Sequence, residues 1–181
     1  MAYKVVLDPG HGGTDPGAVN GKYHESDAAL AIAKKVGAKL KSVGYGVKYT
    51  RTTDKKVTLD RRCDISNLYD ADVFVSIHLN AAANKDASGI ETWRYTNVGS
   101  RTKNLANNVQ TELIAATGAK NRGVKTTTSF YVLKHTVASA VLVEVGFISN
   151  PDEVKKLFQT KYQDKIATAI CSGIIKALKK S

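Results

Sequence analysis

The chain has 181 residues, of which 43% are apolar, so one globular domain with a sizeable hydrophobic core is expected. No window of about 18 uninterrupted apolar residues occurs, which argues against membrane insertion. The net charge of +11 indicates either a device for solubility or attraction to a polyanion, such as nucleic acid, an acidic membrane or an anionic cell-wall polymer.

The distribution of the positive charge along the sequence distinguishes between these candidate partners. Lysines make up 21 of the 27 basic residues and are scattered along the whole sequence. Reading of nucleic-acid bases favours arginines and a focused basic stripe, and the sequence shows no such cluster. We therefore expect no nucleic-acid partner, and the pattern favours diffuse attraction to an anionic polymer.

The N-terminal residues and the cysteines indicate the cellular compartment in which the protein is made. Residues 1–4 lead directly into an apolar run, without the charged and apolar segments of a secretory signal, so we expect synthesis in the cytoplasm without a signal peptide. Cys63 and Cys171 are far apart and form no CxxC pattern, which favours two buried thiols over a disulfide.

The first half of the chain alternates between strand and helix patterns. Residues 5–7 form an apolar run that is typical of a buried strand. Apolar residues then recur at helical spacing, which predicts a helix over 26–43 with Ser26 as N-cap and Gly44 as stop. The next expected elements are a strand at 47–50, a helix at 59–69 and a strand at 73–77.

The second half continues the alternation. Because strands alternate with helices, we predict a single α/β domain over 1–181 with a mostly parallel, twisted sheet and helices on both faces. No internal repeat or low-complexity linker divides the chain. The expected elements are strands at 90–95, 131–133 and 140–145, a helix at 105–116, and a closing helix on which Ile166, Ile170, Ile174 and Leu178 repeat every four residues.

The first strand runs into a glycine-rich loop, LDPGHGGTDPG. Such a loop can cradle a dinucleotide phosphate, but the third position of that fingerprint falls on Asp15, and the loop continues where a helix should begin. The glycines instead allow the backbone to bend tightly around His11 and leave its ring accessible.

Titratable residues lie at the ends of three apolar runs. His11 follows the first strand, His78 follows Ile77, and Glu144 interrupts the run VLVEVGF. Sites of open α/β sheets lie at the carboxyl ends of the strands, so these three residues are expected at one edge. A buried, unpaired Glu144 is costly and needs a cation, a hydrogen-bond donor or a metal-bound water nearby.

Two histidines with carboxylates indicate zinc, which in catalytic sites takes three protein ligands and leaves a position for water. Glu25 is a candidate third ligand, although the helix dipole alone explains an acid at a helix N-terminus. Taken singly, His78 also fits a core histidine and Glu144 an ion pair. The HExxH motif is absent, because the position four residues after His24 is Ala28. Spacing alone therefore indicates a metal site without fixing it.

Seven motifs occur in the order of one family: LDPGHGGTDPGA, YHESDAAL, VSIHLNA, GIETW, NRGVK, FYVL and VLVEVGFISN. From residue 5 to about residue 175 the chain closely resembles the catalytic domain of zinc-dependent N-acetylmuramoyl-L-alanine amidases, a class of bacterial and phage enzymes that cut the cell wall. The resemblance implies that His11, Glu25 and His78 bind Zn²⁺ and that Glu144 is the catalytic residue.

The implied reaction is hydrolysis of the peptidoglycan amide between N-acetylmuramic acid and the L-alanine of the stem peptide. In it, zinc activates a water and Glu144 serves as general base. A zinc carboxypeptidase or endopeptidase acting on the stem peptide and a non-catalytic cationic wall-binding module stay open as alternatives. We expect a monomeric catalytic domain over 1–181 without a separate wall-binding domain, which reaches the wall after phage lysis or lysis of the mother cell.

Four further residues have no assigned role in the resemblance. His24 lies outside the motif positions, which leaves open a swap of the metal ligand with its neighbour. His135 is also outside them and is expected at the surface or in a groove. Asn80 and Arg122 lie within motifs; we expect Asn80 to brace the strand end at His78 and Arg122 to hold the NRGVK loop.

Overall fold

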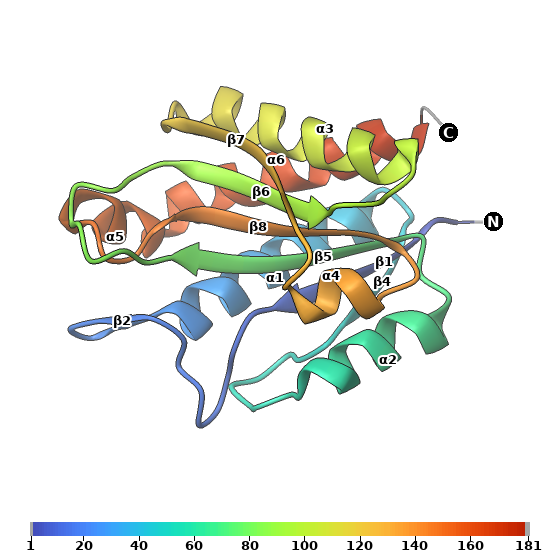
Figure 1. The fold of residues 1–181 in the computed structure, drawn as a ribbon, viewed down its shortest axis with the longest axis horizontal. Helices are drawn as coiled ribbons and strands as arrows, with labels where there is room; N and C mark the ends of the chain where they lie inside the picture. Colours follow the sequence, from blue (N-terminus) through green and yellow to red (C-terminus); the bar gives the residue numbers. More distant parts are fainter. Residues whose placement is uncertain (1, 180–181) are drawn as a thin grey trace.

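The computed structural model describes residues 2–179 and has a six-stranded sheet at its centre (Figure 1). The strand order is β4-β1-β5-β8-β6-β7. The first four strands are mutually parallel, β6 is parallel to β7, and the antiparallel junction lies between β8 and β6. In chain order the elements are β1 (Lys4–Pro9), β2 (Val19–Asn20), β3 (Tyr23–His24), α1 (Glu25–Ser42), β4 (Gly46–Tyr49), α2 (Leu59–Tyr69), β5 (Val73–Asn80), β6 (Ile90–Tyr95), α3 (Ser100–Thr117), β7 (Asn121–Thr127), α4 (Tyr131–His135), β8 (Ser139–Phe147), α5 (Pro151–Leu157) and α6 (Thr160–Lys179).

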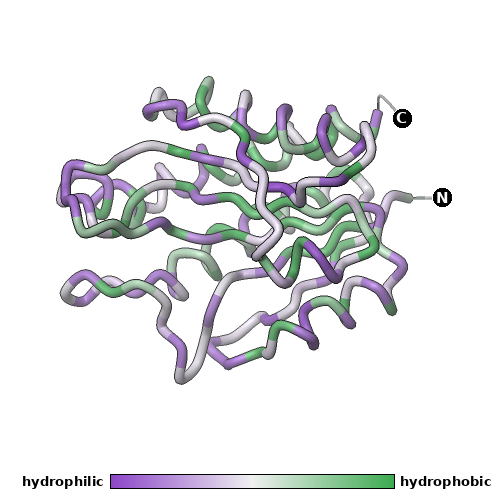
Figure 2. The backbone as a smooth tube through the Cα atoms, viewed as in Figure 1, coloured by the Kyte–Doolittle hydropathy of each residue, from purple (hydrophilic) through white to green (hydrophobic). Residues whose placement is uncertain are grey.

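Helices cover both faces of the sheet, as predicted (Figure 1). Successive side chains of a strand point to opposite faces, so Val5 and Leu7 join the larger core with α1, α3 and α6. Val6 and Phe74 point the other way and pack with residues of α2 and α4. Hydrophobic residues accordingly run along the central strands in Figure 2. The predicted α/β class with a mostly parallel sheet is confirmed.

The first helix starts one residue earlier than its sequence predicts. Glu25 is its first residue, and the Glu25 backbone N–H donates to the Ala18 carbonyl at 3.0 Å. His24 is the N-cap, so the prediction that Ser26 caps this helix is wrong; Ser26 is buried in the first turn. The β2–β3 hairpin ends at His24 and α1 follows at once, so the cap position falls on the last residue of the hairpin. Gly44 follows the helix end with φ 86°, as a stop residue should.

The predicted strand at 131–133 is wrong. These residues begin the short helix α4, in which the Phe130 carbonyl accepts from the N–H groups of Leu133 and Lys134 at 3.1 Å. The β-branched and aromatic composition favours a strand, but packing of Val132 and Leu133 onto the sheet selects a helical turn. The polar strand β7, the hairpin β2–β3 and the short helix α5 carry too weak a pattern to be predicted.

The two cysteines are buried free thiols, as expected. Cys63 lies in α2 and Cys171 in α6, and the two helices pack on opposite faces of the sheet. Within residues 2–179, no helix combines the length and the apolar character needed to cross a membrane.

Candidate metal centre and active site

The four predicted site residues gather at the edge of the sheet formed by the carboxyl ends of β1, β5 and β8. His11 lies in the loop after β1, and Glu25 opens α1. His78 lies near the end of β5, directly opposite Glu144 of β8 in the parallel register. The expected convergence of two histidines and a glutamate at one edge is therefore observed, and Glu25 joins them.

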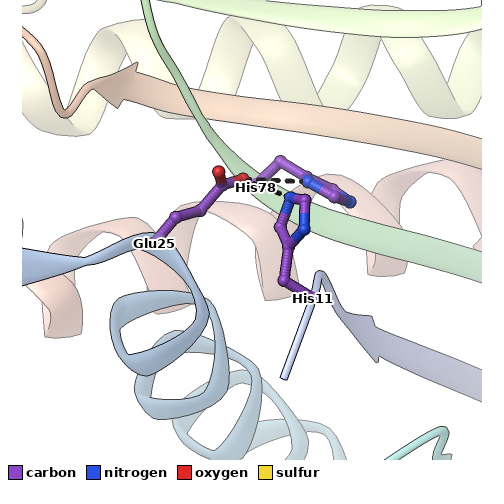
Figure 3. A group of neighbouring side chains, drawn as sticks. All are labelled: His11, Glu25 and His78. Carbon is purple, nitrogen blue, oxygen red and sulfur yellow. Dashed lines mark hydrogen bonds and ion pairs between the residues drawn. The ribbon is translucent and has the colours of Figure 1, made fainter. Parts of the chain in front are cut away.

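Three side chains point their ligand atoms at one another (Figure 3). Glu25 Oε1 lies 3.2 Å from His11 Nε2 and 2.9 Å from His78 Nδ1, and the three ligand atoms lie within 4.8 Å of one another. Ligands about 2.0–2.2 Å from a tetrahedral metal are about 3.3–3.6 Å apart, so the spacing fits a metal of that size. Within residues 2–179 this is the only group of three or more such side chains close enough to share an ion. Two imidazoles and a carboxylate are a donor set that suits zinc.

The carboxylate of Glu25 is held from both sides. The Ala18 N–H donates to Oε2 at 2.9 Å and the Leu79 N–H to Oε1 at 3.0 Å. Burial alone raises the pKa of Glu25, but hydrogen bonds from His11 and His78 outweigh it and keep that pKa far below its ordinary range. Glu25 is thus ionised in the metal-free protein.

His11 is oriented by a second carboxylate. Its Nδ1 lies 2.9 Å from Asp15 Oδ2, which leaves Nε2 to face Glu25. The Glu25 hydrogen bond, opposed by desolvation and aided by Asp15, raises the pKa of His11 to about 9. A carboxylate behind a metal-binding imidazole fixes the ring and increases its basicity. Sequence reasoning missed this role of Asp15, although a carboxylate four residues after a loop histidine is a usable signal.

Glycines in the loop make room for the ligands. A Cβ on Gly10 would lie 2.3 Å from His78 Cε1, and one on Gly17 would lie 2.6 Å from Glu25 Oε2. Gly17 also has φ 68°, which other residues rarely adopt. Close packing against His78 and Glu25 therefore explains Gly10 and Gly17 of the glycine-rich loop, and a bound phosphate is not needed to explain them.

Glu144 is the unpaired acid of the site. Its Oε2 atom is buried and has no hydrogen-bond partner among the described residues. Burial raises the pKa of Glu144 to about 7. A buried polar group without a partner is costly, and a carboxyl group that titrates near neutrality suits general acid–base chemistry.

A cavity of about 640 Å³ opens beside these residues. His11, His78 and Glu144 line one part of it, and its size is typical of a ligand pocket. The walls beyond the ligands are largely apolar and come from α4, β8 and the segment that leads into α2: Val57, Leu59, Phe130, Tyr131, Val132 and Leu142.

Side chains from three of the sequence motifs meet at a second buried glutamate, Glu91 on β6. It accepts hydrogen bonds from Asn80 Nδ2 at 3.0 Å and Trp93 Nε1 at 3.0 Å. Arg122 Nε lies 2.7 Å and Lys125 Nζ 2.8 Å from its Oε2. Asn80 thus braces the end of β5 against β6, and Arg122 ties β7 to β6. Sequence reasoning missed Glu91 itself.

The other two histidines lie outside the metal centre. His24 has a half-exposed side chain whose Nδ1 lies 3.8 Å from Asp27, so the ligand swap is not observed. His135 stacks on Tyr131 with ring centroids 4.1 Å apart, and Tyr131 lines the cavity. The hydroxyl of Tyr131 also donates to Asp60 of α2. His135 is therefore an exposed residue next to the cavity, in line with the expected surface position.

Comparison with known proteins places this chain in a family. Residues 5–176 match the family described as N-acetylmuramoyl-L-alanine amidase. The chain belongs to this family. Among solved structures, the amidase domain superposes on an N-acetylmuramoyl-L-alanine amidase from Clostridium difficile with a TM-score of 0.96 and 38% identity, covering 99% of this chain and 98% of that one. For the catalytic domain of CwlV from Bacillus (Paenibacillus) polymyxa the TM-score is 0.92 at 36% identity, and 99% of each chain is covered.

Curated relatives give the same assignment. The amidase domain is 38% identical over 172 residues to the N-acetylmuramoyl-L-alanine amidase LytC of Bacillus subtilis, covering 94% of this chain and 34% of LytC. It thus spans about a third of the length of LytC. It is 35% identical over 186 residues to the germination-specific N-acetylmuramoyl-L-alanine amidase of the same organism, covering 95% of this chain and 78% of that protein.

Proposed function

We propose that this amidase hydrolyses the amide between N-acetylmuramic acid and L-alanine in peptidoglycan, with a Zn²⁺ ion bound by His11, Glu25 and His78. The observation that carries the proposal is the buried, partnerless Oε2 of Glu144 beside a donor set of two imidazoles and a carboxylate. When bound, zinc supplies a Lewis acid that lowers the pKa of water and polarises the scissile carbonyl.

Glu144 then moves the proton. Its carboxylate accepts a proton from the attacking water and donates it to the nitrogen of the departing alanine, so that the amine leaves neutral. In the metal-free protein burial raises the pKa of Glu144 to about 7, so the site contains a carboxyl group that can take up and release a proton. Asp15 holds the His11 ring in place throughout.

Sugar-bond cleavage does not fit the same site. Glycosidases use two carboxyl groups about 5–9.5 Å apart that flank the bond. Glu25 is engaged by both histidines and two backbone N–H groups, and Glu91 by four side-chain donors. Of the other acids that line the cavity, Asp8 is bound by Arg62, Thr50 and Ser76, and Asp15 by His11 and the Gly17 N–H. Glu144 is therefore the lining acid, among the described residues, that keeps an unpartnered carboxylate oxygen, which favours amide hydrolysis.

The positive net charge of the chain supports a second part of the proposal, which concerns binding to the cell wall. The net charge of +11 favours association with the anionic polymers that accompany peptidoglycan in cell walls. We propose that this attraction concentrates the enzyme at the wall, whereas the metal centre and Glu144 perform the chemistry.

The products of wall digestion test the reaction. Purified walls are treated with the protein, new amino groups are labelled and the labelled residues identified; new L-alanine amino termini without new reducing sugars are expected. A chelator should abolish the release and zinc should restore it. Labelled diaminopimelate or D-alanine without L-alanine would mean a peptidase, and new reducing ends would mean a glycosidase.

A further inference from the structure

The loop that carries His11 has a strained backbone at the ligand itself. His11 has φ 58°, in the left-handed region that few residues other than glycine adopt. Such a conformation persists only where the surroundings hold it. The question is which groups hold the His11 backbone in this conformation.

Arg51 provides the first set of contacts. It follows β4, and its side chain is completely buried under the loop. Its Nε donates to the Pro9 carbonyl at 3.1 Å, and its NH2 donates to the carbonyls of Gly10 at 2.8 Å and Ser26 at 2.7 Å. One guanidinium thus joins the His11 loop to the first turn of α1, which carries Glu25.

Arg62 provides the second set, from α2. Its NH1 donates to the Pro9 carbonyl at 2.7 Å and its NH2 to the His11 carbonyl at 2.8 Å. The same NH1 lies 2.6 Å from Oδ1 of the buried Asp8. Together the two arginines bind three consecutive carbonyl oxygens, those of Pro9, Gly10 and His11.

A contribution to folding stability does not by itself explain why both arginines are buried here. The buried carboxylate of Asp8 pairs with Arg62 and also accepts from Thr50 and Ser76. The buried guanidinium of Arg51 donates to backbone carbonyl oxygens instead. Burial and the neighbouring charge of Arg62 lower the pKa of Arg51. Burying ions in this way is costly, and apolar side chains often serve as well or better. What arginine offers is a rigid fork of donors that fixes several carbonyls at once.

We propose that Arg51 and Arg62 are positioning residues of the metal centre. By binding the carbonyls around His11, they hold its left-handed backbone and aim its Nε2 at Glu25 before the metal binds. The inference rests on the proposed function, because it takes His11 as a metal ligand. It adds two residues that lie 40 and 51 positions away from His11 in the sequence.

The test uses lysine variants, which keep the charge but lose the fork. Zn²⁺ affinity of the metal-free protein is measured by competition with a chromophoric chelator, and Co²⁺ binding by its visible absorption spectrum. For Arg51→Lys and Arg62→Lys we expect the Kd for zinc to rise about 10–100-fold, the usual effect of losing a group that orients a ligand. The Co²⁺ bands should shift. Arg61→Lys, at the exposed neighbouring position on α2, should match the wild type.

A stability control separates positioning from simple destabilisation. Ile174→Ala removes a fully buried side chain from α6, outside the loop and the metal centre, and should lower the melting temperature while leaving zinc affinity unchanged. An equal loss of zinc affinity in Ile174→Ala would overturn the inference. Unchanged affinity and Co²⁺ spectra in both lysine variants would also overturn it.

A measurement on the wild type does not depend on whether the variants fold. Carbon chemical shifts of the metal-free protein should show His11 already in the left-handed conformation, and a disordered loop would overturn the inference. If the wild type bound no zinc, the proposed function and this inference would fall together. If the wild type bound zinc and the lysine variants bound it equally well, the inference alone would fall.

Discussion

Glu91 and Glu144 lie directly opposite each other on the antiparallel strands β6 and β8. Their surroundings shift the pKa values of the two carboxyl groups in opposite directions. Burial raises the pKa of Glu91, but Lys125 and Arg122 outweigh it and leave that pKa below its ordinary value, whereas burial raises the pKa of Glu144 to about 7. One carboxylate is thus held ionised as an anchor for three strands, and its neighbour is left free to exchange a proton.

The first prediction concerns Glu144. Glu144→Gln keeps the shape of the side chain and removes the base. Zinc content, measured by atomic emission, should stay at the wild-type level, because Glu144 lies outside the three-ligand group. Turnover of a soluble muropeptide should fall by about 10²–10⁴, the usual scale of general acid–base catalysis. Near-normal turnover would make Glu144 a structural residue.

Glu91→Gln should act on stability more than on chemistry. The change leaves Arg122 and Lys125, both about one-third exposed, without their shared countercharge. We expect the free energy of unfolding, measured in urea, to fall by about 1–3 kcal/mol, with zinc content retained. Glu112→Gln is the matched control, because Glu112 pairs with Lys176 at an exposed site and should cost less than about 1 kcal/mol. Equal losses in both variants would contradict the anchoring role.

The metal ligands form the third prediction. Purified protein should carry about one zinc per chain, as three ligands around one position imply. His78→Ala should lose most of the metal while the far-ultraviolet circular dichroism spectrum remains that of an α/β fold. Stoichiometric zinc in His11→Ala, Glu25→Ala and His78→Ala alike would rule out this ligand set.

The fourth prediction follows from the charge of His11. In the metal-free protein its pKa is raised from 6.5 to about 9, mainly by the hydrogen bond to Glu25. A raised pKa means that the folded state binds the proton more tightly than the unfolded state. This stabilisation is complete below pH 6.5 and is lost as the pH rises to about 9.

Melting temperatures of metal-free protein between pH 6 and pH 9.5, a range that brackets both values, should therefore decline more in the wild type than in His11→Gln. Zinc must displace the same proton, so calorimetry in buffers of different ionisation enthalpy should detect proton release on binding below about pH 9. Parallel pH curves for the two proteins would contradict the raised pKa.

The parts of the site that sequence could predict are those that interrupt a pattern. His78 and Glu144 stand out because each breaks an apolar run, and His11 because glycines surround it. Glu25 sits where the helix dipole alone favours an acid, so the sequence pattern made it only a candidate ligand and the family resemblance raised it above that alternative. Strands and helices with strong periodicity were likewise predicted, apart from their end residues.

The residues that sequence could not predict are charged residues buried by tertiary structure. Arg51 and Arg62 stand among polar neighbours in the sequence, and Glu91 is one polar residue of a mixed strand pattern, IETWRY. Their burial arises only when segments far apart in the chain come together: Arg62 meets Asp8 across 54 positions, and Arg122 meets Glu91 across 31. No local spacing encodes such contacts. The helix α4 was missed for a related reason, since its packing overrides its composition.

The last prediction concerns the positive charge. If the lysines attract the enzyme to anionic wall polymers, binding to whole walls should weaken steadily with salt, because the screening length falls from about 10 Å at 0.1 M to about 3 Å at 1 M. Hydrolysis of a small soluble muropeptide should change much less over the same range, since it depends on the metal centre and Glu144. Walls stripped of their phosphate-bearing polymers serve as the control and should bind with a weaker salt dependence. Equal salt dependence for intact walls and for the muropeptide would show that the net charge of +11 serves solubility alone.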